Sequence, residues 1–412
     1  MTDAVATTQD ADTAALKDEI ASALEASRAT LLALSHEIHD DPELSWQEHR
    51  AALRVAGTLR DAGFAVTTAA YGVETAVEAV YGDGDLSVVI CAEYDALPGV
   101  GHACGHNIIA AAGVGAAIAL LPVADRAGLR VTLLGTPAEE HGGGKVSLLQ
   151  AGAWEDADFS LMVHGAAGED RGASSFVSTA VDRFAVEFHG VTAHAAGAPE
   201  KGVNAASAAA LSLNAIAFLR QHLPSTTNLN AFISLGGEAT NIIPDRAVVQ
   251  VEVRAYEIDA WRDLKKRVLA CFEGAAIATG TTWSWEQTEH PYAPLEHDAG
   301  LAPLWDANMA LRGRELAEGS LLGGGSTDMG NVSQVVPSLH GMIAVLGSEA
   351  VPHNPAFTAD AASPAADDAV IDGAAVIAFT ALDAALDPAV RASLKARKAA
   401  RPAGATRITL EA

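Results

Sequence analysis

Side chains that can bind metal ions or move protons gather in five short segments at the ends of predicted strands. The segments are AEYDALP with Glu93 and Asp95, GHACGHN with His102, Cys104 and His106, PAEE with Glu139 and Glu140, MVHG with His164, and VPHNP with His353. Open α/β sheets place their sites at the carboxyl ends of strands, so we expect these side chains to converge. Thiolate, imidazole and carboxylate together form a ligand set for divalent transition-metal ions. The sequence therefore predicts a metal site.

The segments around these residues predict the elements that position them. LSVVICAEYDALP and LRVTLLGTPAEE are typical of buried strands, and a helix of small residues is predicted between them at 108–121. Strand, helix and strand in that order indicate a parallel sheet covered by helices. Further helices are expected at 16–39, 48–62 and 367–386.

The middle of the chain predicts a second, smaller domain. DRFAVEFHGVTAH, NAFISLGGEAT, RAVVQVEVRAY and TTWSWEQTEH alternate apolar and polar residues as strands do. Helices are predicted at 203–223 and 260–279. This pattern favours an antiparallel sheet of four strands packed against two helices.

The fold class that follows is α/β, with the small domain inserted into the large one. We expect a large catalytic domain with a mainly parallel sheet at residues 15–177 and 291–412. The smaller α+β domain is expected at 178–290, and a disordered tail at 1–14.

Charge and composition exclude several classes of function. Lys and Arg number 26 against 52 Asp and Glu, and the formal net charge of −26 would repel nucleic acids and anionic membrane surfaces. No apolar run approaches the roughly 18 residues that span a bilayer, and the N-terminal segment lacks the features of a signal peptide. The three cysteines, Cys91, Cys104 and Cys271, are too few for a disulfide framework. We expect a cytoplasmic protein with no nucleic-acid or membrane partner.

An ordered series of motifs resembles the M20 family of metallopeptidases, in particular the amidohydrolases of its subfamily D. Within them, the chain is similar to the group of β-alanyl-lysine-type dipeptidases and p-aminobenzoyl-glutamate hydrolase. The resemblance covers about residues 36–386 and rests on PELSWQEHRAA, AEYDALPGVGHACGHN, GTPAEE, MVHG, GVTAHAAG, GVNA, TNIIPDRA, GSTDMGNVS and PHNPAF. It implies two divalent metal ions per chain, zinc, manganese or cobalt. It also implies that the small domain at 178–290 is a lid and dimerisation domain, through which a homodimer forms.

The resemblance also implies roles for single residues in the large domain. The implied metal ligands are Cys104, His106, Glu140, His164 and His353, with the Cys104 thiolate as a bridge between two ions. Glu139 stands at the family's general-base position, beside a ligand. Adjacent residues of a regular strand face opposite ways, so the use of both Glu139 and Glu140 requires an irregular turn, which the HGGG segment after them supplies.

Three residues of the small domain complete the implied site. His194 and Asn241 match family residues that polarise the scissile carbonyl and stabilise the oxyanion, and His194 acts in its own or in the partner's active site. Arg254 is a candidate for binding a substrate carboxylate. Two positions depart from the family pattern: Asn107 stands where Asp is commonest, and His141 follows the glutamate pair where a small residue is usual.

Two hypotheses for function follow. In the first, the protein is a metal-dependent hydrolase that cleaves an amide or peptide bond in a dipeptide or N-acyl amino acid by attack of a metal-activated water. In the second, it is a catalytically idle relative that binds a small molecule or a partner subunit. The second hypothesis requires a lost ligand or base, and every one of these positions is filled.

Overall fold

The computed structural model describes residues 2–319, 325–407 and 410, with the backbone alone for residues 2–11. It divides into two compact units, each with its own core. The large unit comprises Met1–Val177, Leu295–Gly323 and Asp328–Thr409, and the small unit comprises Ser178–Pro294, Gly324–Thr327 and Leu410–Ala412.

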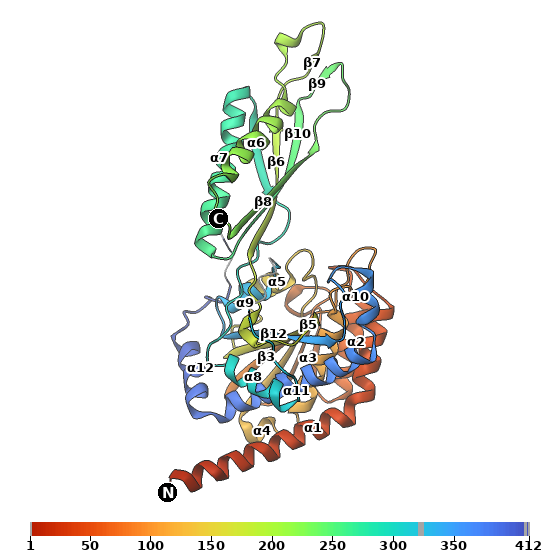
Figure 1. Ribbon diagram of the computed structural model, residues 1–412, viewed down its shortest axis with the longest axis vertical. Helices are drawn as coiled ribbons and strands as arrows, with labels where there is room; N and C mark the ends of the chain where they lie inside the picture. Colours follow the sequence, from red (N-terminus) through yellow and green to blue (C-terminus); the bar gives the residue numbers. More distant parts are fainter. Residues whose placement is uncertain (1, 320–324, 408–409, 411–412) are drawn as a thin grey trace. The chain divides into compact units, whose positions relative to one another are not determined.

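The large unit is built on a sheet of six strands in the order β1-β2-β4-β3-β5-β12 (Figure 1). The strands are β1 (Ala65–Thr68), β2 (Val77–Tyr81), β3 (Leu86–Ala92), β4 (Leu129–Gly135), β5 (Phe159–Gly168) and β12 (Ser338–Leu346). β3, β4, β5 and β12 pair in parallel, and β1 and β2 form an antiparallel edge. Every residue of β3 is buried, as expected of a parallel strand covered on both faces. The predicted mainly parallel sheet is thus confirmed.

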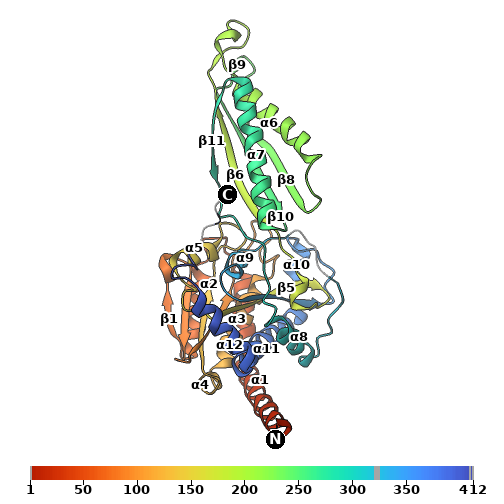
Figure 2. The ribbon, with the colours of Figure 1, turned by 90° about the vertical axis from the view of Figure 1, so that its left-hand side faces the viewer.

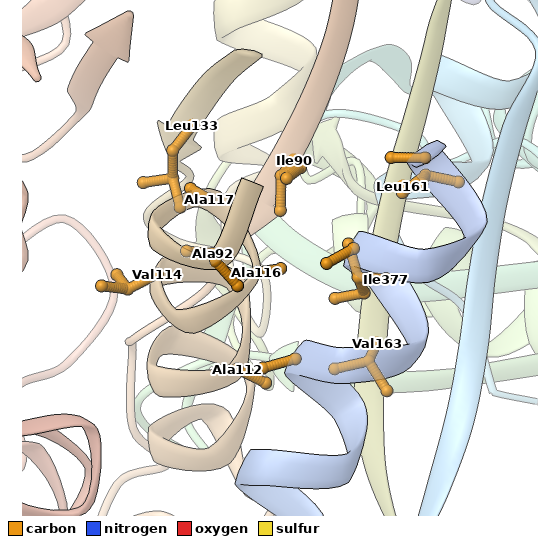
Figure 3. Packing of buried hydrophobic residues seen from close by; sticks show 14 of the residues in the cluster. Ile90, Ala92, Ala112, Val114, Ala116, Ala117, Leu133, Leu161, Val163 and Ile377 are labelled. Carbon is orange, nitrogen blue, oxygen red and sulfur yellow. The ribbon is translucent and has the colours of Figure 1, made fainter. Parts of the chain in front are cut away.

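Helices cover both faces of this sheet. They are α1 (Thr2–Asp40), α2 (His49–Asp61), α3 (His106–Leu120), α4 (Ala124–Ala127), α5 (Gly144–Ala151), α8 (Ala302–Leu311), α9 (Met329–Ser333), α10 (Pro355–Asp360), α11 (Pro364–Leu386) and α12 (Pro388–Ala400). Val88 and Ile90 of β3 pack in the core with α1, α3 and α11, whereas Val89 and Cys91 pack in a separate cluster with α5 and α9. Figure 3 shows the first of these layers, where the small residues of α3 let α3 and α11 pack closely on the strands.

The first helix differs from the prediction. We expected a disordered tail at 1–14 and a helix from residue 16, whereas α1 is one continuous helix from Thr2 to Asp40. Leu24, Leu31 and Ile38 lie on its buried side and anchor it to the core.

We expected no apolar run long enough to span a bilayer, but one helix, α11, reaches that length. By length and composition alone, α11 could cross a membrane, and it is the one helix in the described part of the chain that could. However, 83% of its most apolar window is buried inside the protein. Figure 3 shows its Ile377 facing the sheet beside Val163 of β5. α11 is therefore a core helix of the large unit.

The small unit has the expected antiparallel sheet with two helices on it (Figure 2). The sheet has the order β11-β6-β10-β8, and the elements are β6 (Ala180–His189), α6 (Ala205–Arg220), β8 (Thr227–Leu235), β10 (Arg246–Ala255), α7 (Ile258–Thr279) and β11 (Thr282–Gln287). DRFAVEFHGVTAH was expected to be one strand. It forms instead β6 and a short β7 (Ala193–His194), which pairs with β9 (Ile242–Ile243) in a separate two-stranded sheet.

Close packing of the backbone in β12 yields a prediction about stability. A Cβ atom on Gly341 would lie 2.1 Å from Cζ2 of Trp305, whose side chain is fully buried. We expect Gly341→Ala to lower the free energy of unfolding by about 1–3 kcal/mol, because the buried ring must move. The matched control is Gly57→Ala in α2, where nothing lies within 4 Å and the change should be neutral or stabilising by up to about 1 kcal/mol. Denaturation followed by circular dichroism measures both, and equal stability of the two variants would contradict this account.

Candidate metal centre

The polar side chains found in the sequence lie where strands of the large unit end. Glu93 and Asp95 directly follow β3, and His164 lies within β5. The others stand on neighbouring loops and helix ends: Cys104 and His106 at the start of α3, Glu139 and Glu140 after β4, and His353 before α10. The carboxyl ends of parallel strands meet at one edge of a sheet, which is where open α/β proteins place their sites.

These side chains form three overlapping sets of potential metal ligands. The first set is Cys104, His106 and His164, the second is Cys104, Glu140 and His353, and the third is Glu93, His106 and Glu139. Within each set, the donor atoms lie within 4.8 Å of one another. Cys104 belongs to both of the first two sets, so its sulfur is shared by them. All five residues expected to be metal ligands are therefore brought together.

Several buried atoms of the centre fit a cation. Within the described part of the chain, Nε2 of His106, Oε2 of Glu93 and Oε1 of Glu140 have no hydrogen-bond partner. Buried polar atoms are nearly always paired. Nε2 of His106 lies 3.6 Å from Oε2 of Glu93 and 3.7 Å from Oε1 of Glu140, beyond hydrogen-bond distance. A divalent cation bound by the deprotonated ring would be a partner that fits all three atoms.

Asp95 orients two of the segments that face the centre. Its Oδ1 atom lies 3.0 Å from Nδ1 of His106, and its Oδ2 atom accepts hydrogen bonds from the backbone N of Glu140 at 3.0 Å and from Oγ of Ser45 at 2.8 Å. Burial alone would raise the pKa of Asp95, but the facing His106 lowers it well below its ordinary value. With Nδ1 bonded to this carboxylate, the His106 ring presents Nε2 to the centre.

His164 is held in the tautomer that a metal ligand needs. Its Nδ1 atom lies 2.7 Å from the backbone oxygen of Gly165 and donates to it. Nε2 therefore keeps its lone pair, and it lies 3.6 Å from Sγ of Cys104. Burial lowers the pKa of His164 to about 4, so the ring is neutral at pH 7.

The environment of Cys104 suits a metal ligand better than a free nucleophile. Burial, with the Glu140 carboxylate beside it, raises the pKa of the thiol well above its ordinary value. Reactive thiols have lowered pKa values, whereas a coordinated metal ion deprotonates a thiol outright. A cation at the centre would therefore convert Cys104 to the thiolate.

The irregular turn expected at the glutamate pair is confirmed, and it begins earlier than the HGGG segment. Ala138 has a φ of 58°, in the left-handed region that is uncommon for residues with side chains. Oε1 of the buried Glu48 accepts hydrogen bonds from the backbone N of Ala138 at 2.8 Å and of Trp46 at 2.9 Å, and Trp46 also has a positive φ. Burial, with Asp95 nearby, raises the pKa of Glu48 to about 7. Glu48 thus stabilises the turn that carries Glu139 and Glu140.

Glu139 lies beside the ligand sets, with 8% of its side chain exposed. Its Oε2 atom is 3.8 Å from Nε2 of His106. Burial, and after it the Glu93 and Glu140 carboxylates, raise the pKa of Glu139 well above its ordinary value. A carboxylate in this environment has a strengthened affinity for protons, which suits a general base.

A buried ion cluster behind the centre was missed by the sequence analysis. Nζ of Lys145 donates to Oε1 of Glu93 at 2.5 Å and to Oδ1 of Asp328 at 2.7 Å, and all three side chains are fully buried. The backbone N of Lys145 donates to Oδ2 of Asp328 at 2.8 Å. Buried charges are costly unless paired, so this cluster fixes the strand end at Glu93, α5 and the start of α9 together. The available signal was a lysine that directly follows three glycines in an otherwise apolar segment.

The small unit brings two of its three expected site residues together. His194 lies in β7 opposite Ile242 of β9, and Asn241 directly precedes β9. The backbone N of Ala195 donates to the backbone oxygen of Asn241 at 2.9 Å. Both side chains are exposed at this short sheet.

Arg254 lies in β10 and is already engaged by neighbours. Its Nε atom donates to Oε1 of Glu252 at 2.8 Å, and its Nη1 atom donates to Oγ of Ser326 at 3.1 Å. A substrate carboxylate would therefore have to share this guanidinium with Glu252.

The two departures from the family pattern lie in different surroundings. Asn107 is buried, and its Nδ2 atom donates to Oγ of Ser35 at 2.9 Å and to the backbone oxygen of Ala361 at 2.8 Å. Asn107 thus ties α3 to α1, and Asp95 supplies the carboxylate beside His106. His141 is exposed on the loop after the glutamate pair.

Comparisons with known proteins place this site in context. Residues 171–279 match the family model described as a peptidase dimerisation domain. The chain is 36% identical over 392 residues to Xaa-Arg dipeptidase of Mus musculus, covering 91% of this chain and 90% of that protein. It is 31% identical over 280 residues to one of the p-aminobenzoyl-glutamate hydrolase chains of Escherichia coli (strain K12), covering 63% of this chain and 58% of that protein.

Solved structures share the fold. An aminobenzoyl-glutamate utilization protein from Klebsiella pneumoniae aligns with a TM-score of 0.68 at 21% identity, over 88% of this chain and 97% of that one. A dinuclear metal-binding peptidase of the M20 family from Bacillus subtilis aligns with a TM-score of 0.64 at 20% identity, over 86% of this chain and 99% of that one. Because the similarity to the dipeptidase spans nearly the whole of both chains, the protein described here belongs to the M20 family of peptidases.

Proposed function

We propose that this protein is a two-metal hydrolase that cleaves the amide or peptide bond of a dipeptide or N-acyl amino acid. The observation that carries the proposal is the position of Cys104, whose sulfur is shared by two ligand sets next to Glu139. Dipeptides with a C-terminal arginine are the first substrates to test, because a relative that matches nearly the whole chain is named Xaa-Arg dipeptidase.

The proposed ligands are Cys104, His106 and His164 for one ion and Cys104, Glu140 and His353 for the other. When bound, two divalent ions would supply Lewis-acid chemistry, polarising the scissile carbonyl and acidifying water at neutral pH. Zinc, manganese and cobalt all suit a set of thiolate, imidazole and carboxylate groups.

Glu139 is the proposed general base. Its position beside the ligand sets, its partial exposure and its raised pKa suit it to take a proton from the attacking water. The same carboxyl group then donates that proton to the leaving nitrogen. No covalent intermediate with the protein is required.

His194 is the proposed carbonyl-polarising residue of the small unit. The backbone N atoms of Ala196 and Gly197 donate to its Nδ1 atom at 3.2 and 3.0 Å. A nitrogen that accepts hydrogen bonds carries no proton, so the neutral ring has its proton on Nε2 and can donate it to a carbonyl oxygen. Asn241, beside it, is proposed to stabilise the oxyanion, and Arg254 to bind a substrate carboxylate.

We further propose a homodimer formed through the small unit. The match to a peptidase dimerisation domain supports it. So do the exposed Phe232 and Ile233 on the edge strand β8 and the exposed Leu211 and Phe218 on α6, because exposed apolar side chains on an edge strand favour pairing with a second copy.

A cytoplasmic location without nucleic-acid or membrane partners also remains a proposal. Cys91, Cys104 and Cys271 are all unpaired, which suits a reducing compartment. The net charge of −26 argues against polyanionic partners.

The role of Glu139 can be separated from metal binding. We expect Glu139→Gln to keep both ions, because the residue is in neither of the proposed ligand sets, and to lower kcat by about 10²–10⁴-fold through loss of the base. Metal content by mass spectrometry and turnover of Xaa-Arg dipeptides and N-acyl amino acids measure the two effects. Wild-type protein that binds two ions yet hydrolyses nothing in this panel would favour the catalytically idle alternative.

The shared thiolate gives a second prediction, in which a second buried cysteine, Cys91, is the control for Cys104. Cys104→Ala should weaken the binding of both ions, because one sulfur serves both ligand sets. Cys91→Ala should leave metal content unchanged, because Cys91 is buried in β3 within an apolar cluster. Equilibrium dialysis against graded chelator compares them, and equal affinities in the two variants would count against the bridging role.

A mixing experiment decides in which active site His194 acts. His194→Ala and Glu139→Gln are each expected to be nearly inactive as homodimers. If His194 serves the partner's site, each mixed dimer regains one intact site, and random exchange restores about a quarter of wild-type activity. If His194 serves its own protomer, the mixture stays as inactive as its components. Sedimentation analysis of the wild type provides the control, since a monomer would exclude the arrangement in which His194 serves the partner's site.

A further inference from the structure

We propose that Glu93 is a sixth metal ligand, facing the ion that His106 binds, and that Lys145 holds it in place. This inference rests on the proposed two-ion centre and adds one residue to it.

The geometry of Glu93 is that of a ligand with one oxygen anchored and one available. Its side chain is fully buried, directly after β3. Oε1 accepts a hydrogen bond from Nζ of Lys145 at 2.5 Å. Among the residues that the structure describes, Oε2 has no hydrogen-bond partner, and it lies 3.6 Å from Nε2 of His106, which has none either.

His106 shows the same arrangement. Its Nδ1 atom lies against Oδ1 of Asp95 at 3.0 Å, which leaves Nε2 for the centre. Ligating side chains in metalloproteins are typically anchored in this way, with a second group bonded to the atom that does not touch the metal. Asp95 anchors His106, and Lys145 anchors Glu93. The two available atoms face the same space, together with a carboxylate oxygen of Glu139.

Burial separates the roles of Glu93 and Glu139. A general base must reach the water that attacks the substrate, and 8% of the Glu139 side chain is exposed. Glu93 is fully buried and cannot meet a substrate. An ion pair with Lys145 alone would also leave Oε2 of Glu93 unpaired in the interior, which is unfavourable. A cation between Glu93 and His106 satisfies both unpaired atoms.

The anchor itself is rigid. Lys145 donates to Asp328 through both Nζ, at 2.7 Å, and its backbone N, at 2.8 Å.

A carboxylate added to a set of imidazole and thiolate groups also makes that position more favourable for harder ions such as manganese. Loss of Glu93 should therefore weaken manganese binding more than zinc binding.

The test compares Glu93→Gln with Asp328→Asn in the full-length protein. Each variant removes one negative charge from the same buried cluster, but only Glu93 faces His106. Asp328→Asn also gives up one of the two hydrogen bonds that Asp328 accepts from Lys145, so it is the more severe test of a general disturbance. We expect Glu93→Gln to bind one of its two manganese ions at least about 10-fold more weakly than wild type. Asp328→Asn removes no ligand, so it should weaken neither ion as much as Glu93→Gln does. Manganese content after dialysis against graded chelator, with electron paramagnetic resonance of the bound ion, gives the readout.

Two outcomes would overturn the proposal. One is wild-type affinity for both ions in Glu93→Gln, and the other is equal weakening in Asp328→Asn, which would mean that the whole cluster had been disturbed. If Glu93→Gln does not fold, Glu93→Asp keeps the negative charge beside Lys145 but shortens the side chain by one methylene, which withdraws the carboxylate from His106, and it is expected to show the same weakened ion. The wild-type metal content and hydrolysis test the proposed function independently, because they do not depend on Glu93.

Discussion

The metal centre depends on one buried carboxylate, that of Asp95. Its two oxygens fix the ring of His106, the backbone of Glu140 and the hydroxyl of Ser45, which come from three distant segments of the chain. A carboxylate in the interior is costly unless its hydrogen-bonding capacity is used, and here it is used on both oxygens. The same interactions that stabilise the charge therefore set the direction in which two ligands face.

Buried hydrogen bonds also hold two strained backbone positions at the candidate centre. Ala138 and His353 both have positive φ, at the residue before the glutamate pair and at the last expected ligand. Such conformations persist only where the surroundings hold them. The Glu48 carboxylate bonds to the N–H of Ala138, and the backbone N of His353 donates to the oxygen of Ala103, one residue before Cys104. The loops that carry ligands are thus fixed by buried contacts and do not depend on their own propensities.

Much of the fold could be predicted, because hydrophobic patterning is local. The buried run of β3 and the alternating strand β10 indicate their sheets directly. The pairing of Lys145 with Glu93 and Asp328 could not be predicted, because it joins residues 52 and 183 positions apart and depends on packing. Local patterning likewise did not reveal that Asn107 bonds to α1. The candidate residues stood out because their types are unusual at strand ends, and the resemblance selected the expected ligands among them. The groups that orient them resemble ordinary charged residues.

The proposed function depends most on Cys104, whose sulfur would be shared by two metal ions. Anomalous X-ray diffraction from crystals of the metal-loaded protein, collected on both sides of the absorption edge, tests it directly. We expect two anomalous peaks per chain, one beside His106 and His164 and the other beside Glu140 and His353, with the sulfur within bonding distance of both. A single peak, or two peaks of which neither contacts Cys104, would contradict it.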